Sequence, residues 1–328
     1  MLTSLLGVGL GLAILIAGGA LLVHGASQIA SSLGVAPMVV GLTIVGFGTS
    51  APELVVNVIG ALDQQTELAF GNVVGSNISN LSLVLGAAAI FQRITIRSEL
   101  LLREVPLLLL ATTTISVMAL DGALDGGASV LSRSEAITLM LIFGIFLYIM
   151  TLDFLRSRSE DALLTNIADT TLVNTPKPSS FCWLQALGGL VLLGVGGDLT
   201  INQGVELADL LGVSPTIVGL FVVAVGTSMP ELITSTIAAV RGEADLALGN
   251  VVGSNLFNSL LVLPASAVIT PVTIPAGGLA DLSLSWLLAA ALIPFFVLGK
   301  ARLGRPVGVM LLLGYGAYAF LRIGQAGA

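Results

Sequence analysis

Charge is scarce in this chain. Only 9% of its 328 residues are charged and 55% are apolar, whereas soluble domains carry about 25% charged residues. The formal net charge of −7 is spread thinly, and no basic run offers a surface for nucleic acid. With a mean hydropathy of +1.04, the chain is expected to be an all-α polytopic membrane protein surrounded by the lipid bilayer.

Cysteine and histidine are nearly absent, with Cys182 and His24 as the single examples. One cysteine excludes a disulfide framework and a thiolate metal site, and one histidine excludes the metalloprotease pattern HExxH. Ser50 and Ser228 have no histidine at a matching place, so neither an intramembrane hydrolase nor another enzyme is expected. We also expect no bound cofactor and no obligatory protein partner.

Long apolar runs, by contrast, fill most of the chain and predict ten membrane-spanning helices. The first run lacks a basic leader segment, so we expect a retained helix rather than a cleaved signal peptide. Pro37 and Pro215 stand at helix starts, where proline is best tolerated. The approximate limits of the spans are 4–33, 37–62, 68–91, 99–120, 134–155, 183–211, 215–240, 246–270, 281–299 and 305–323.

The first five predicted helices repeat in the last five. A shift of 178 residues places Glu53 on Glu231 and Asn80 on Asn258 without a gap, and 21 of the 38 residues from 48 to 85 are identical. We divide the chain into a first repeat (1–155), a linker too short to be a folded domain (156–180) and a second repeat (181–328). An odd number of spans per repeat requires opposite orientations, as in many secondary transporters, whose site lies at the midplane between the repeats.

The basic residues indicate which way the chain faces. If the N-terminus is extracytoplasmic, ten of the twelve Lys and Arg residues fall in cytosolic segments, and only Arg133 and Arg322 fall outside. Positive-inside sorting favours this orientation. We therefore expect a protein of the cell (plasma or inner) membrane with both termini extracytoplasmic and 156–180 in the cytosol.

The most unusual segments are GTSAPEL (48–54) and GTSMPEL (226–232), which place a proline and a glutamate inside apolar spans. Proline deprives the carbonyl four residues earlier of its helical partner, so we expect locally unwound helices with free carbonyls over 46–49 and 224–227. Such backbone survives at membrane depth only inside protein or beside a wet cavity. With nearby side-chain oxygens it forms a set of hard ligands suited to Ca²⁺. Those side chains are Thr49, Ser50, Glu53, Thr227, Ser228 and Glu231.

Each motif also fits a capping box, in which the serine accepts a backbone hydrogen bond and the glutamate reaches back to the helix start. We favour ligation because the motif occurs twice, each time near the centre of a span. An ionisable residue inside a membrane is a functional candidate by default. Capping and ligation can also coexist.

The helices that follow both carry GNVVGSN, at 71–77 and 249–255. The glycines of each copy, four residues apart, form a ridge that allows close helix approach. Ser76 and Asn80 share a helix face, as do Ser254 and Asn258, and we favour a ligand role for these four because they can face the broken helices. Four further asparagines either bind the ion or form hydrogen bonds between helices, and these are Asn72, Asn77, Asn250 and Asn255.

Together these segments resemble the two α-repeats of sodium/calcium exchangers, within the calcium/cation antiporter superfamily. The likeness covers both halves, including GGALLVHGA and GGDLTINQG in the preceding helices. It implies antiport of Ca²⁺ against Na⁺, by a prokaryotic type without a large regulatory loop, and a first and sixth helix that slide past the rest. Glu53 and Glu231 would be the central ligands. The implied remainder of the Na⁺ and Ca²⁺ sites is Thr49, Ser50, Ser76, Asn80, Thr227, Ser228, Ser254 and the carbonyls of Gly46 and Ala224.

Asn258 departs from the family pattern, in which many members carry aspartate. With two carboxylates instead of three acidic groups, H⁺-coupled exchange of Ca²⁺, or of another divalent cation, stays open as an alternative, because carboxylates in a partly dry site can carry protons. A cation channel is the alternative from another class, although a continuous pore needs no inverted repeat. Asp198 lies inside the sixth predicted span, and we interpret it as a cavity or helix-end carboxylate rather than a ligand.

Overall fold

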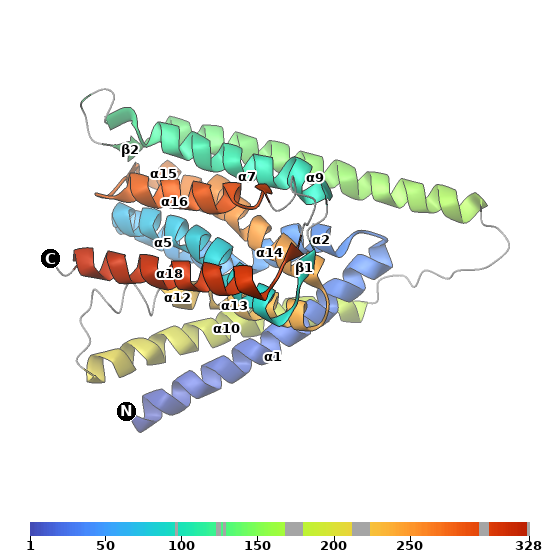
Figure 1. The fold of residues 1–328 in the computed structure, drawn as a ribbon, viewed down its shortest axis with the longest axis horizontal. Helices are drawn as coiled ribbons and strands as arrows, with labels where there is room; N and C mark the ends of the chain where they lie inside the picture. Colours follow the sequence, from blue (N-terminus) through green and yellow to red (C-terminus); the bar gives the residue numbers. More distant parts are fainter. Residues whose placement is uncertain are drawn as a thin grey trace.

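The computed structural model is a bundle of helices with two short two-stranded sheets (Figure 1). It describes residues 1–95, 98–122, 126, 129–167, 180–211, 224–294 and 302–326. Helices lie in each of the ten predicted spans, although the segment around Pro215 is outside the described residues. Within the described part, five helices are long and apolar enough to cross a membrane, or six if one bent pair counts as a span. The chain is therefore a multi-pass, all-helical membrane protein, while the ten-span arrangement stays a prediction.

The first half starts with one long helix and continues with interrupted ones. Helix α1 ends at Gly34, whose left-handed backbone (φ 68°, ψ 23°) closes it as glycine commonly does. The last helix, α9, continues past residue 155 to Ile167, so the first part of the predicted linker is helical and projects from the bundle in Figure 1. The elements are α1 (Leu2–Leu33), α2 (Pro37–Val40), the π-helical η1 (Gly41–Val45), α3 (Gly46–Thr49), α4 (Ala51–Leu62), α5 (Thr66–Ser79), the π-helical η2 (Asn80–Val84), α6 (Leu85–Phe91), β1 (Ile94–Thr95), α7 (Ser98–Met118), β2 (Val130–Leu131) and α9 (Arg133–Ile167).

The second half repeats this order. From α3 to β1, each element of the first half has a counterpart in the second with both limits displaced by 178 residues. The sequence duplication is thus also a duplication of secondary structure. The elements are α10 (Ser180–Leu210), α12 (Ala224–Thr227), α13 (Met229–Val240), α14 (Ala244–Phe257), the π-helical η4 (Asn258–Val262), α15 (Leu263–Ile269), β3 (Val272–Thr273), α16 (Gly278–Ala290), β4 (Arg302–Leu303) and α18 (Arg305–Ala326).

Contacts between the halves relate them as antiparallel partners. β1 pairs with β4 and β2 with β3, both antiparallel, and the two sheets lie at opposite ends of the bundle in Figure 1. α1 and α10 lie side by side, with early residues of one beside late residues of the other. A Cβ at Gly11 would lie 3.1 Å from the Gly196 carbonyl oxygen, and a Cβ at Gly18 would lie 3.0 Å from that of Gly189. Glycine is what allows the two backbones to approach so closely.

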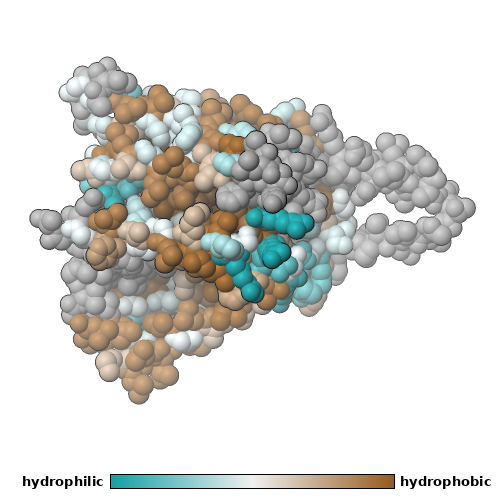
Figure 2. Space-filling model, viewed as in Figure 1, coloured by the Kyte–Doolittle hydropathy of each residue, from teal (hydrophilic) through white to brown (hydrophobic). Residues whose placement is uncertain are grey.

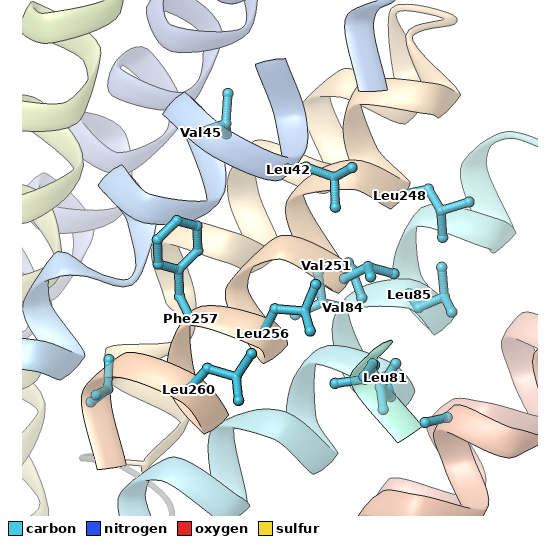
Figure 3. Close-up of a cluster of buried hydrophobic side chains, with 14 of the residues drawn as sticks. Leu42, Val45, Leu81, Val84, Leu85, Leu248, Val251, Leu256, Phe257 and Leu260 are labelled. Carbon is cyan, nitrogen blue, oxygen red and sulfur yellow. The ribbon is translucent and has the colours of Figure 1, made fainter. Parts of the chain in front are cut away.

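Much of the core is apolar, and so is much of the outer surface. Figure 3 shows buried side chains of η1, η2, α6, α14 and η4 packed together. The labelled ones are Leu42, Val45, Leu81, Val84, Leu85, Leu248, Val251, Leu256, Phe257 and Leu260. Large apolar side chains are exposed along α1, α10 and α18, as expected of helices that face lipid. In Figure 2 hydrophilic residues gather where β1 and β4 lie, and Arg93, Arg302 and Arg305 are exposed there.

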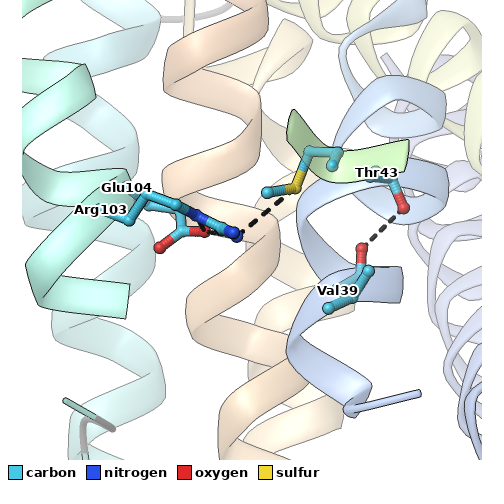
Figure 4. Close-up of polar contacts among 5 residues, drawn as sticks. Val39, Thr43, Arg103 and Glu104 are labelled. Atoms are coloured by element: carbon cyan, nitrogen blue, oxygen red, sulfur yellow. Dashed lines mark hydrogen bonds and ion pairs between the residues drawn. The ribbon is translucent and has the colours of Figure 1, made fainter. Parts of the chain in front are cut away.

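Many polar side chains outside the centre are satisfied locally (Figure 4). Arg103 of α7 is paired with the neighbouring carboxylate of Glu104, and its Nη2 lies 4.0 Å from the sulfur of Met150 on α9. The Thr43 hydroxyl donates to the carbonyl of Val39, one turn earlier, at 2.6 Å. Hydroxyls that bond back to their own helix in this way satisfy their donor without a partner from another helix.

Candidate cation-binding site

The two proline motifs interrupt their helices at a single residue. Ser50 separates α3 from α4 (φ −85°, ψ 1°), and Ser228 separates α12 from α13 (φ −85°, ψ 3°). The first break bends the span by 41°. The predicted unwinding over 46–49 and 224–227 is wrong, because both stretches are helical turns. A proline at the second position of the next helix needs no N–H partner there, so one residue is enough to redirect the chain.

The serines of the two breaks do not cap the helices they precede. Neither Ser50 nor Ser228 makes a side-chain capping bond, so the capping-box interpretation is wrong for both. Ser50 Oγ instead donates to Glu231 Oε1 across the two halves at 3.2 Å. The break thus turns a polar side chain from its own helix toward the opposite repeat.

Glu53 and Glu231 are brought together in the centre of the bundle. They are 1% and 0% exposed, respectively, and each retains one carboxylate oxygen, Oε2, without a hydrogen-bond partner. Ser50, three residues before Glu53, donates to Glu231, so the two carboxylates lie in the same buried region. Burying two like charges is costly unless a cation or protons compensate for them, so this pair is a strong attractor for positive charge.

Each broken helix carries one threonine whose hydroxyl bonds an asparagine of the other half. Thr49 Oγ1 donates to Asn250 Oδ1 at 3.1 Å, and Thr227 Oγ1 lies 3.4 Å from Asn72 Oδ1. Ser254 Oγ lies 3.3 Å from Thr49 Oγ1 and 3.4 Å from the Gly46 carbonyl oxygen. The structure therefore places these predicted residues in one buried layer around the glutamates.

Close backbone packing holds this layer in place. A Cβ at Gly249 would lie 2.5 Å from the Met38 carbonyl oxygen, and one at Gly253 would lie 2.6 Å from that of Leu42. The predicted glycine ridge is thus confirmed in α14, where it packs on α2 and η1. This contact sets the neighbouring Ser254 beside Gly46.

Asn80 and Asn258 each open a π-helical segment, η2 and η4. π-helical turns inside α-helices occur frequently at functional sites. η4 packs against α4, which carries Glu53, and η2 packs against α13, which carries Glu231. Both asparagines are 0% exposed, so each amide lies buried close to a glutamate helix of the opposite half.

The site contains buried oxygen atoms that no hydrogen bond occupies. Among the described residues, six such oxygens belong to predicted site residues, where each would carry the cost of an unmade hydrogen bond if nothing else bound there. Hard cations such as Ca²⁺ take six to eight oxygen ligands. The six are Oε2 of Glu53 and Glu231, Oγ of Ser76 and Ser228, and Oδ1 of Asn80 and Asn258.

Other residues differ from expectation or were missed. Asp198 is exposed on α10, outside the buried layer. Asn72 and Asn250 each bond a threonine of the other half, and behind them lie Asn57 and Ser235, which sequence reasoning missed. Their only sequence signal is a polar residue four positions after each glutamate. Ala224 opens α12 immediately after a segment outside the described residues.

Comparison with known proteins identifies the group to which this arrangement belongs. Residues 3–152 and 181–324 match the sodium/calcium exchanger protein family, which leaves only the central linker and the extreme ends unmatched. The chain belongs to this family. It is a membrane cation antiporter of that family and not an enzyme.

The exchanger has relatives along nearly its whole length. It is 38% identical to CaxA of Alkalimonas amylolytica over 98% of this chain and 99% of the relative. It is 34% identical to inner membrane protein YrbG of Escherichia coli, over 90% and 89% of the two chains, and 29% identical to sodium/calcium exchanger MaX1 of Methanosarcina acetivorans, over 94% and 95%. A structure of the sodium-calcium exchanger NCX_Mj soaked with Na⁺ and Sr²⁺ superimposes with a TM-score of 0.80, at 26% identity and over 97% and 99%.

Proposed function

We propose that the protein exchanges Ca²⁺ for Na⁺ across the membrane by alternating access to the central site. The observation that carries this proposal is a set of six buried oxygens that lack hydrogen-bond partners, of which two belong to the buried carboxylates of Glu53 and Glu231 and four to neutral side chains. Two carboxylates neutralise one Ca²⁺, and oxygen-only ligation is what Ca²⁺ and Na⁺ prefer over softer metals. The names of MaX1 and NCX_Mj as sodium/calcium exchangers support the same ion pair.

The ligands in this proposal are the twelve positions singled out in the sequence. Glu53 and Glu231 hold the divalent ion, and the hydroxyl, amide and carbonyl oxygens complete its shell or bind Na⁺ in its place. The hydroxyls of Thr49 and Thr227 donate to asparagines of the other half and keep their oxygen lone pairs, which can contact a cation. The remaining ligands are Ser50, Ser76, Asn80, Ser228, Ser254 and Asn258, with the carbonyls of Gly46 and Ala224.

The proposed architecture is a pair of inverted five-helix repeats, 1–155 and 181–328, joined by 156–180, with broken second and seventh helices. The matched elements, the antiparallel α1 and α10, and the two sheets at opposite ends support it. Inverted repeats provide two equivalent ways of opening one midplane site, and therefore alternating access.

We place both termini outside the cytosol and 156–180 inside it, in a cell membrane, as the name of YrbG suggests for that relative. In a Cys182→Ser background, Gly126→Cys should react with an impermeant thiol reagent only from outside, and Thr170→Cys only from the cytosol. Labelling of both positions from one side would contradict the inverted arrangement, since an odd number of spans lies between them.

Asn258 keeps proton coupling as the second candidate. Where an aspartate would add a third carboxylate, this exchanger has an amide, so the site carries less negative charge to be balanced by Na⁺ during the return step. Radiolabelled Ca²⁺ uptake into proteoliposomes decides between the two. Uptake driven by an outward Na⁺ gradient at equal pH supports Na⁺ exchange, whereas uptake driven only by a pH gradient supports H⁺ exchange, and uptake independent of both would overturn antiport.

A further inference from the structure

The two amides that open the π-helical segments are held differently, although their positions are equivalent. Asn80 Nδ2 donates to Asn255 Oδ1 at 3.0 Å, which leaves Asn80 Oδ1 as a fixed, uncommitted oxygen. The equivalent bond in the other half would run from Asn258 Nδ2 to Asn77 Oδ1. Within the described part of the chain, neither of those atoms has a hydrogen-bond partner, and Asn258 Oδ1 has none either.

The difference originates in Ser259. Asn77 Nδ2 donates to the hydroxyl of Ser259, the residue next to Asn258, at 2.9 Å, and this bond fixes the orientation in which Asn77 Oδ1 accepts no hydrogen bond. A shift of 178 places Ser259 on Leu81, which has no hydroxyl to hold Asn255 in the same way. Asn255 accordingly stays with Asn80 and donates its own Nδ2 to the backbone carbonyl of Asn77 at 3.2 Å.

From this we infer that Ser259 is a positioning residue that leaves the Asn258 amide without a hydrogen-bond anchor, and so lowers the affinity for Ca²⁺ on the side of the site that the second half supplies. This inference rests on the function proposed above. An anchored amide such as Asn80 presents its oxygen to a cation without further ordering, whereas a free amide loses rotamer freedom when it binds. A weaker contact on one side favours release of the ion, which exchange requires as much as binding.

The test removes the hydroxyl and measures binding and turnover separately. In Ser259→Ala, Asn77 loses the bond that fixes its amide, so the amide can turn until Oδ1 accepts from Asn258 Nδ2, which would anchor Asn258 as Asn80 is anchored. We expect the half-saturating Ca²⁺ concentration of exchange to fall about threefold to tenfold, the effect of one well-placed hydrogen bond, with a lower maximal rate because release is slower. Ser259→Thr keeps the hydroxyl and should restore the parent values.

A matched control and a double-mutant cycle separate positioning from packing. Ser82→Ala also removes a buried hydroxyl from a π-helical segment, but Ser82 bonds only back to Ile78 of its own helix, so the half-saturating concentration should not change. In an Asn258→Ala background, Ser259→Ala should have no further effect, since the amide on which it acts is gone. An equal shift in both backgrounds, or no shift in Ser259→Ala alone, would overturn the role of Ser259.

Direct binding keeps this test independent of transport. Equilibrium binding of radiolabelled Ca²⁺ to the purified full-length chain should tighten in Ser259→Ala by the same factor, whichever ion drives exchange. If the parent binds Ca²⁺ but does not exchange it for Na⁺, the proposed function fails while the cycle still tests Ser259. If exchange proceeds and the cycle shows no coupling, only the inference on Ser259 fails.

Discussion

The two halves of the site present the same proposed ligand side chains but differ in the residues behind Asn72 and Asn250. In the first half Asn72 donates to Asn57 Oδ1 at 2.6 Å, and Asn57 in turn donates to the Ala69 carbonyl at 3.0 Å. In the second half Asn250 donates to Ser235 Oγ at 2.9 Å, a shorter side chain at the equivalent position. The side chains proposed to touch ions are the same in both halves, so we look for the origin of functional asymmetry in the residues that support them.

The largest expected effect tests the feature that the halves share. Glu53→Gln and Glu231→Gln should each reduce Ca²⁺ exchange to background, because either leaves an occupied site with an uncompensated positive charge. The measurement is Ca²⁺ uptake into proteoliposomes, with size-exclusion profiles and thermal unfolding as controls for folding. Normal uptake by both variants would show that the ion binds elsewhere.

The next prediction uses the asymmetry of the two amides. Asn80→Asp replaces the donor to Asn255 Oδ1 with an oxygen, so two buried acceptors face each other; we expect a less stable protein, by about 1–3 kcal/mol. Asn258→Asp breaks no hydrogen bond and should fold like the parent.

The transport of Asn258→Asp should nevertheless change. Three neighbouring carboxylates cannot all remain ionised when the site is empty, so one holds a proton. Exchange should then become weaker in mild acid and need more Na⁺ or H⁺ for each Ca²⁺. Initial flux measured against pH and against Na⁺ concentration tests this, and curves that superimpose on the parent would place position 258 outside the coordination shell.

The sequence predicts the proposed ligands of this site well, but it does not predict the supporting residues Asn57 and Ser235. Two copies of GTSxPEL and GNVVGSN suffice to find the helix breaks, the glutamates and the glycine ridge, because proline, glycine and buried charge have strong local consequences. Asn57 and Ser235 lack such a signal, since a polar residue in an amphipathic position has many uses. The π-helical segments were also missed, because they depend on packing between distant helices rather than on local residue types.

A third, smaller effect concerns the backbone contact between the halves. Gly253→Ala would place a methyl group 2.6 Å from the Leu42 carbonyl oxygen, and relieving this overlap should cost about 1–3 kcal/mol of stability. Gly314→Ala on α18 is the control, because no atom lies within 4 Å of its Cβ position. Thermal unfolding of the two variants measures the difference. Equal midpoints would mean that α14 and η1 can separate without loss.

The smallest expected effect tests the supporting residues Asn57 and Ser235 directly. Asn57→Ala removes two hydrogen bonds and leaves Asn72 Nδ2 without its acceptor, whereas Ser235→Ala removes one bond, that from Asn250. Because each asparagine orients a threonine of the opposite half, the half-saturating Ca²⁺ concentration should rise about tenfold in Asn57→Ala and about threefold in Ser235→Ala. Ser116→Ala, whose hydroxyl bonds only to Thr112 of its own helix, should match the parent. If the half-saturating Ca²⁺ concentration shifts equally in Asn57→Ala and Ser235→Ala, the two residues support the site equally. Its asymmetry would then lie at the amides of Asn80 and Asn258 alone.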